Sequence, residues 1–350
     1  MAAGGKGGAR RQAAQARHVV RIADVARAAG VSTATVSRAL SAPAQVTPAK
    51  RDKVMAAVRS LGYTPNAAAR DLRARSSRSI LVVTGTRANP FFAQVLEGLS
   101  DTLSAEGYAV VMGTCGSEAQ TTHLLDLVHA GRLDGVVAVS GKLPAAGGRT
   151  VFGGKVPVVS ICAEVEGAIN VLVDDFACAK AQAEHLIGLG HRRLLYIAGP
   201  EGNYNELRRF AGFLAATERA GLFAGDVFRF SGDFLFSGGA AAALRFLDLP
   251  HRPTGVVCCN DEMAIGFIKT LRVVARIEVP RDVSVVGFDG IEFADYCEPT
   301  LTTIHQPQRA LGETSAKLLL AALRGEASPP GGRVVLEARL RVAASTGRAA

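Results

Sequence analysis

The chain has 350 residues, of which 48% are hydrophobic, so it is long enough for two or three domains with sizeable cores. Its net charge of +9 is unevenly distributed: residues 1–78 hold 15 Lys and Arg but only three Asp, whereas the other 272 residues hold 25 basic and 28 acidic side chains. This asymmetry predicts a basic module that meets a polyanion, joined to a near-neutral module with a different task; a solvated basic tail is the alternative.

Neither a membrane protein nor a secreted protein is expected from the sequence. No stretch approaches the roughly 20 apolar residues that span a bilayer, and residues 1–17 lack the apolar core of a secretory signal. The six cysteines show no CxxC spacing and mostly lie in or beside apolar runs, where a thiol acts as a small buried hydrophobe. These features predict a protein of the reducing cytoplasm, without structural disulfides and without a membrane partner.

After a Gly-, Ala- and Arg-rich segment, residues 1–19, which we expect to be a disordered basic arm, the sequence predicts two short helices. RIADVARAAG (21–30) places apolar residues at helical spacing, and Gly30 suits a helix C-terminus. Ser32 is a good N-cap for a second helix over 33–40, in which Val36 and Leu40 face inward. Two helices around a tight glycine turn are typical of a helix-turn-helix unit.

The outward face of the second helix carries short side chains, Thr33, Ala34 and Ser37, followed by Arg38. Such a face can press into a major groove, where hydroxyl, methyl and guanidinium groups reach base edges or phosphates. A third helix after Thr47-Pro48 has an apolar face formed by Val54, Ala57, Val58 and Leu61. The alternative is a purely structural three-helix unit with ordinary polar residues outside.

Residues 24–72 resemble the signature of the LacI family of bacterial repressors, DVAxxAGVSxxTVSRxL followed by GYxPNxxAxxL. The resemblance implies a helix-turn-helix domain over 20–64, and a hinge helix and linker over 65–78. In that family a leucine of the hinge wedges into the minor groove, which assigns this role to Leu72; a linker residue packed on the core is the alternative. The implied DNA contacts are Ser32, Thr33, Ala34, Thr35, Ser37, Arg38, Asn66, Arg70, Leu72 and Arg73.

From residue 79 onward, short Val- and Ile-rich runs alternate with helix-length segments. The predicted buried strands are ILVVT (80–84), YAVVM (108–112), GVVAVS (135–140), PVVSI (157–161), RLLYIAG (193–199), TGVVCCN (254–260) and VSVVGFD (283–289). Buried apolar strands that alternate with helices predict parallel sheets covered on both faces, and about 270 residues favour two sheets over one. Ligands of such sheets bind at the carboxyl ends of the strands.

The family resemblance continues through NPFF (89–92), LGHRRLLYIAGP (189–200), RRFAGF (208–213), NDEMAIG (260–266), VPRDVSVVGFDG (279–290) and PTLTTIHQP (299–307). It implies an all-α helix-turn-helix head plus an α/β core similar to periplasmic binding proteins, with two parallel-sheet lobes joined by three crossovers. The implied ligand-binding and dimerisation domain is 79–345, with an N-lobe over about 79–175 and 304–333 and a C-lobe over about 176–303 and 334–345.

Carried over position by position, the resemblance implies a ligand site of Phe91, Phe92, Asn203, Asn205, Arg209, Phe234, Asn260 and Asp289. Aromatic rings with converging Asn, Arg and Asp suit a sugar or a nucleoside; the alternative for each is a structural role. Residues 232–239 and 247–254 are most similar to the cytidine-repressor branch of the family, and next to the purine-repressor branch. An arginine of the purine branch is replaced by Asn203, which favours a nucleoside or a pentose over a purine base.

An enzyme is the main competing class. The sequence contains no GxGxxG after a strand, no GxxxxGK[ST], no GxSxG and no HExxH. Asp174 and Asp175 precede a predicted helix over 176–189 and are interpreted as capping residues. His185 and His191 lack companions at metal-ligand spacing. We therefore expect no catalytic residue, metal or cofactor.

The sequence as a whole predicts a ligand-responsive transcriptional repressor. Its partners would be a pseudo-palindromic double-stranded DNA operator, a small nucleoside or sugar effector, and a second copy of the chain in a homodimer. A solute-binding protein, or a sugar-responsive regulator of hexose or pentose metabolism, is the alternative. Whether the effector releases DNA or promotes its binding stays open.

Overall fold

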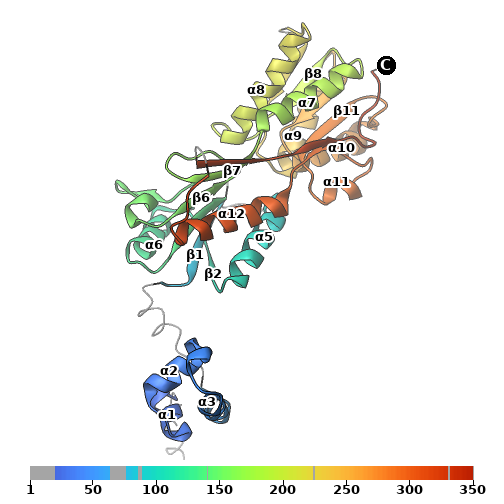
Figure 1. Ribbon diagram of the computed structural model, residues 1–350. Helices are drawn as coiled ribbons and strands as arrows, with labels where there is room; N and C mark the ends of the chain where they lie inside the picture. The colour runs from blue at the N-terminus through green and yellow to red at the C-terminus, as the bar shows by residue number, and fades with distance from the viewer. Residues whose placement is uncertain are drawn as a thin grey trace, which may run out of the picture. The chain divides into compact units, whose positions relative to one another are not determined.

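The computed structural model describes residues 20–63, 76–85, 89–139, 141–223, 225–329 and 332–349, and it divides into two units at Arg75/Ser76. The first unit contains the helices α1 (Ile22–Ala29), α2 (Thr33–Ser41), η1 (Pro43–Gln45, a 3₁₀ turn) and α3 (Pro48–Leu61) (Figure 1).

Three small aliphatic side chains form the centre of this helical head. Val25, Val36 and Val54 come one from each α-helix, and none has exposed surface. Gly30 ends α1 with φ at 65°, a left-handed conformation that glycine adopts without strain. Leu61, predicted to face inward, is 37% exposed at the last position of α3, because the inward face of that helix ends one turn earlier.

The second unit contains two six-stranded sheets, which confirms the predicted pair of lobes. The first sheet has the order β13-β7-β6-β3-β1-β2 and all its strands are parallel. Its strands are β1 (Ser79–Thr84), β2 (Ala109–Thr114), β3 (Gly135–Val139), β6 (Val158–Ile161), β7 (Ile169–Val173) and β13 (Arg333–Leu336). A small hairpin, β4 (Ala145–Ala146) and β5 (Arg149–Thr150), and the 3₁₀ turn η2 (Val151–Gly154) join β3 to β6.

The second sheet has the order β14-β12-β11-β10-β8-β9, and only β14 runs antiparallel to its neighbour. Its strands are β8 (Leu194–Ile197), β9 (Val227–Phe230), β10 (Gly255–Cys258), β11 (Ser284–Asp289), β12 (Thr302–His305) and β14 (Arg339–Arg341). Buried Val, Leu and Ile side chains fill the central strands of both sheets, as expected for strands covered on both faces.

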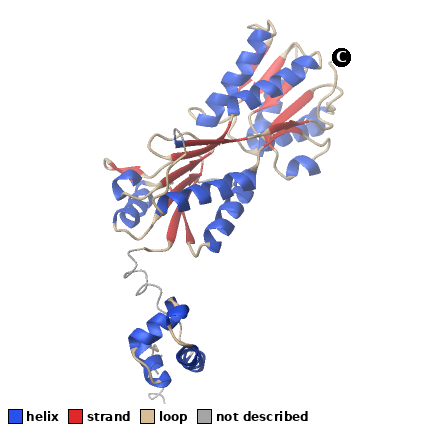
Figure 2. Ribbon diagram, in the orientation of Figure 1, coloured by secondary structure: helices blue, strands red, loops and turns tan. Residues whose placement is uncertain are grey.

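Helices flank both sheets, so that the strands of each lobe lie between them (Figure 2). The first sheet is covered by α5 (Phe91–Ala105), α6 (Glu118–His129) and α12 (Gln308–Leu323); the second by α7 (Asp175–Gly188), α8 (Tyr204–Arg219), α9 (Phe236–Leu247), α10 (Asp261–Ala275) and the short α11 (Phe293–Tyr296). Helices α5 and α12 approach closely at Gly312, where an added Cβ would lie 1.9 Å from the Val95 carbonyl oxygen.

The strand predicted at 108–112 is not fully buried. It corresponds to β2, which lies at the edge of the first sheet, and Met112 on it is 57% exposed. An edge strand has a neighbour on one side only, and its Val-rich run does not reveal this position.

The chain exchanges lobes three times, at 173–175, 305–308 and 336–339. We therefore define the N-lobe as residues 76–173 and 308–336, and the C-lobe as 175–305 and 339–349. The predicted exchange points at 304 and 334 are too early, because β12 pairs with β11 as far as His305 and β13 pairs with β7 as far as Leu336. The predicted end at 345 is also too early, since Ala349 N still donates to the Leu189 carbonyl oxygen.

Residues 76–78, predicted to belong to the linker, are anchored on the N-lobe. The Asp134 carboxylate accepts hydrogen bonds from the backbone N–H groups of Ser77 and Arg78, at 2.7 and 3.0 Å, and from the hydroxyls of Ser76 and Ser77. These donors hold the pKa of Asp134 below its ordinary value despite partial burial, which opposes them.

Candidate functional site

The second helix of the head presents the surface that the sequence predicts for DNA contact. Ser32 caps α2 as predicted: its hydroxyl accepts a hydrogen bond of 3.2 Å from Thr35 N and lies 2.9 Å from the Thr35 hydroxyl. The remaining predicted contacts on this helix are half-buried at Ser37 and exposed at Thr33, Ala34 and Arg38. Apart from Arg38, the side chains on this exposed face are short, as close approach to a groove requires.

Four further predicted DNA contacts, Asn66, Arg70, Leu72 and Arg73, lie outside the described residues, as does the predicted arm over 1–19. The wedge role of Leu72 and the hinge helix stay predictions from the sequence.

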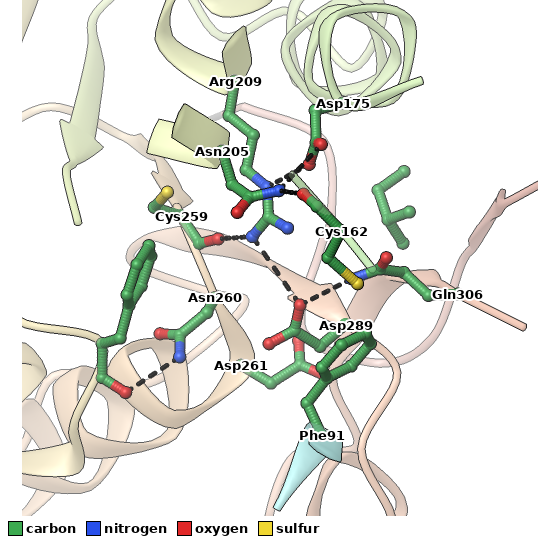
Figure 3. A network of polar contacts seen from close by, with 12 residues as sticks. Phe91, Cys162, Asp175, Asn205, Arg209, Cys259, Asn260, Asp261, Asp289 and Gln306 are labelled. Carbon is green, nitrogen blue, oxygen red and sulfur yellow. Dashed lines mark hydrogen bonds and ion pairs between the residues drawn. The ribbon is translucent and has the colours of Figure 1, made fainter. Parts of the chain in front are cut away.

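A buried polar network joins the two lobes where strands of both sheets end (Figure 3). Its centre is Arg209 of α8, which is 5% exposed. Arg209 Nε lies 2.7 Å from Asp175 Oδ1, and Nη1 lies 2.6 Å from the Cys259 carbonyl oxygen and 3.6 Å from Asp289 Oδ1. The guanidinium also stacks over the Phe288 ring, 3.5 Å from its centroid.

Two amide side chains complete the network. Asn205 Nδ2, one turn before Arg209, donates to Asp175 Oδ2 at 3.0 Å and to the carbonyl oxygen of Cys162, which follows β6 of the N-lobe. Gln306 Nε2 donates to Asp289 Oδ1 at 2.8 Å. We call Asp175, Asn205, Arg209, Asp289 and Gln306 the Arg209 cluster.

Burial dominates the electrostatics of this cluster. Desolvation raises the pKa of Asp289 to about 7, although Arg209 and the Gln306 hydrogen bond oppose it. Desolvation works against the charge of Arg209, but the carboxylates of Asp175 and Asp289 outweigh it and raise its pKa above the ordinary value. Asp289 also has φ at 124°, a strained conformation for a residue with a side chain, of the kind that clusters at binding sites.

Two of the three predicted asparagines use their side chains to begin helices. Asn203 Oδ1 accepts from Glu206 N at 3.1 Å and caps α8. Asn260 Oδ1 accepts from Met263 N at 3.1 Å and caps α10, while its Nδ2 donates to the Phe234 carbonyl oxygen at 2.9 Å. Asn260 thereby positions the loop that carries Phe234.

The predicted aromatic residues belong to different lobes. Phe91 and Phe92 begin α5, with ring centroids 5.0 Å apart in an edge-to-face arrangement, and Phe91 is 4% exposed within the N-lobe core. Phe234 belongs to the C-lobe, is half-buried, and packs its ring on Gly199, where an added Cβ would lie 2.4 Å from the ring. Phe91 thus serves the core, whereas Phe234 is only half-buried.

Sequence reasoning missed Asp175 and Gln306. The sequence predicts a capping role for Asp174 and Asp175, and Asp174 does accept from Ala177 N at 3.1 Å. Asp175 is instead 4% exposed and paired with Arg209. The signal that was available is the strand that ends at Val173, because a second carboxylate directly after a parallel strand lies at the ligand edge of the sheet.

Neither a metal centre nor a membrane-spanning helix is found in the described part of the chain. No group of three or more His, Cys, Asp or Glu side chains there is arranged to hold a metal ion. Nor does any helix there have the length and hydropathy needed to cross a bilayer.

Known families match both units. The model of the bacterial regulatory proteins of the lacI family matches residues 21–66, and that of the periplasmic binding protein-like domain matches residues 183–346. Among curated proteins, the HTH-type transcriptional repressor CytR of Escherichia coli K12 is 34% identical over 316 residues, which are 89% of this chain and 92% of the relative. The ribose operon repressor of the same strain is 34% identical over 301 residues, 85% of this chain and 91% of the relative.

A solved structure gives the same result. The lac repressor dimer bound to operator and the anti-inducer ONPF aligns with a TM-score of 0.82 and 29% identity, covering 94% of this chain and 99% of that chain. The match with CytR agrees with the resemblance of residues 232–239 and 247–254 to the cytidine-repressor branch. The predicted fold class, a helical head with a periplasmic-binding-protein-like core, is confirmed. By its identity to CytR over nearly the whole of both chains, this protein belongs to the lacI family of DNA-binding transcriptional regulators.

Proposed function

We propose that the protein is a cytoplasmic, homodimeric repressor that binds a pseudo-palindromic DNA operator and responds to a small effector. The observation that carries the proposal is the pairing of two features in one chain: the small-residue face of α2 and the buried Arg209 cluster. CytR and the ribose operon repressor are named as repressors, and the lac repressor was solved as a dimer on its operator, which supports this assignment.

In this function the two recognition helices of a dimer enter successive major grooves. Thr33, Ala34 and Arg38 would face base edges, while the excess positive charge of residues 1–78 would contact phosphates. The hinge helix predicted within residues 65–78 would bend the operator centre.

The effector would bind between the lobes at the Arg209 cluster. The chemistry there offers a fixed guanidinium, the Asp289 carboxylate and the amides of Asn205 and Gln306, while Asn260 holds the loop of the half-buried Phe234 in the same lobe. Converging donors and acceptors next to an aromatic face suit a nucleoside or a pentose. Asn205 also reaches across to the N-lobe at Cys162, so ligand contact with it would act on both lobes.

DNA binding is tested by titrating labelled duplexes with the full chain in a salt series. A dimer that makes six to ten phosphate contacts should lose about 10³- to 10⁵-fold in affinity between 50 and 200 mM salt. Arg38→Ala should weaken binding, whereas Arg272→Ala, exposed on α10 of the C-lobe, should leave it unchanged. A solute-binding protein would not bind duplex DNA in any of these conditions, and that outcome would refute the proposal.

Effector binding is tested by thermal shift with nucleosides, pentoses and hexoses. A ligand that binds only the folded state raises the melting temperature with concentration. A response to nucleosides or pentoses that Arg209→Met abolishes supports the assigned site. A response confined to hexoses would refute the nucleoside and pentose assignment but leave DNA binding intact.

A further inference from the structure

Glu262 is a buried carboxylate that the cluster described above does not use. It lies in the first turn of α10, two residues after Asn260, and is 4% exposed. Its Oε1 atom is buried and has no hydrogen-bond partner within the described residues. An unpaired buried oxygen of this kind costs about 1–3 kcal/mol or more, and such atoms are rare in folded proteins.

Glu262 lies near two other carboxyl groups of the C-lobe. The two charges that act most on Glu262 are those of Asp289, which ends β11, and Asp233, in the loop between β9 and α9. Helix α10 itself follows β10, which lies next to β11 in the sheet. Glu262 therefore belongs to the same carboxyl edge of the C-lobe sheet as Asp289.

The neighbouring carboxylates have partners of their own. Asp261 accepts hydrogen bonds from the backbone N–H groups of Gly290 and Ile291, at 2.7 and 3.0 Å, and from the Thr303 hydroxyl. Asp233 Oδ1 accepts from Leu235 N at 2.9 Å. Unlike these oxygens, Glu262 Oε1 accepts no hydrogen bond from any donor in the described part of the chain.

The charges around Glu262 limit which kind of ligand can donate a hydrogen bond to it. Glu262, Asp233 and Asp289 gather at one edge, while the guanidinium of Arg209 is already shared between Asp175 and Asp289. Burial, and next the charge of Asp289, raise the pKa of Glu262 to about 7. A ligand that brings a further negative charge would be repelled, whereas an uncharged hydrogen-bond donor would satisfy the free oxygen.

We propose that Glu262 is an effector-binding residue that accepts a hydrogen bond from an uncharged donor group, a hydroxyl or an exocyclic amino group, and that it selects against phosphorylated sugars and nucleotides. This inference rests on the proposed function and names the class of effector that the site accepts.

Calorimetric titration of the full chain tests it with four pairs of probes: cytidine, adenosine, ribose and glucose, each beside its 5′- or 6-phosphate. At least one uncharged probe should bind, and its phosphorylated counterpart should bind at least about tenfold more weakly. Glu262→Met should weaken the uncharged probe by about 10- to 100-fold, the usual loss for a hydrogen bond to a charged group. Glu218→Met, an exposed glutamate on α8 of the same lobe, should bind as the wild type does.

Glu262→Gln separates recognition from structure, because it keeps an oxygen acceptor but removes the charge. It should weaken binding of the uncharged probe less than Glu262→Met does. It should also reduce the ratio between the affinity for that probe and the affinity for its phosphorylated counterpart. An unchanged ratio in Glu262→Gln, or unchanged affinity in a folded Glu262→Met, overturns the inference alone. If no probe binds the wild-type chain, the proposed effector function fails together with it.

Discussion

Replacing Arg209 by Met should destabilise the core unit strongly. The guanidinium is 5% exposed and lies 2.7 Å from Asp175 Oδ1 and 3.6 Å from Asp289 Oδ1. Its removal leaves two buried carboxyl groups without their cation, and breaking a buried pair in this way costs about 3–5 kcal/mol. For a unit of this size, that loss corresponds to a melting temperature lower by about 6–10 °C.

The loss of stability should also depend on pH, because Asp289 can become neutral by taking up a proton. Arg209 opposes the rise in the pKa of Asp289, so its removal should raise that pKa beyond about 7. Asp289 is then neutral in slightly acidic buffer in both proteins, and the cost of losing Arg209 becomes smaller. We expect the difference in unfolding free energy to be larger at pH 8 than at pH 6.

Urea unfolding followed by circular dichroism at both pH values measures this difference. In the Arg209→Met background, Asp175→Asn should recover about 1 kcal/mol or more, since it removes one of the two uncompensated charges. Arg219→Met is the matched control, because Arg219 is 75% exposed and its ion pair with Glu184 should contribute less than about 1 kcal/mol. An Arg209→Met variant as stable as this control, with no recovery in the double variant, would refute the reasoning.

Three further predictions concern other parts of the molecule. Ser32→Ala removes the cap of α2 and should cost about 1 kcal/mol, seen as roughly fivefold faster amide exchange in that helix. Gly312→Ala places a Cβ 1.9 Å from the Val95 carbonyl oxygen, so α5 and α12 must separate. We expect the unfolding free energy measured with urea to fall by about 3 kcal/mol. The control Gly188→Ala, which has open space around it, should leave that free energy unchanged or raise it. The pKa of Glu262 is raised to about 7, so between about pH 4.5 and 7 the folded chain binds a proton that the unfolded chain does not. This proton stabilises the folded state by at most about 3 kcal/mol at low pH, and the stabilisation is lost as pH rises through 7. Glu262→Gln should therefore reduce the decrease in unfolding free energy over this pH range, and an unchanged pH dependence would contradict the prediction.

The fold was predictable where burial leaves a strong pattern. Strands β1, β3, β8, β10 and β11 match the predicted Val- and Ile-rich runs to within two residues at each end, since both faces of a central parallel strand are covered. Strand β7 is equally apolar, but it follows β6 through a loop too short to hold a helix, so the expected alternation of strand and helix fails there. The half-exposed edge strand β9 has no continuous apolar run to mark it.

The sequence predicts a site residue well where that residue type, at that position, has only one usual role. The family resemblance assigned Arg209 to the site, whereas Asp289 is indicated both by the resemblance and by its position at the end of a predicted strand. Asparagine at a helix start serves equally as a cap or as a ligand contact, and the sequence could not separate these roles at Asn203 and Asn260. Asp175 was missed because its neighbour Asp174 satisfied the capping interpretation alone.

The position of the Arg209 cluster explains how a small ligand could act on the whole core. Asp175 follows the first crossover directly, and Gln306 lies within the second, so two of the three connections between the lobes end in residues that hold this network together. A ligand that takes one hydrogen bond of Arg209 or Asp289 exchanges a contact to a charged group, worth about 1.5–3 kcal/mol. Coupling between effector and operator needs about 1–3 kcal/mol of difference between lobe arrangements. One such bond, made in one lobe arrangement and not in the other, is therefore comparable in free energy to the coupling that is required.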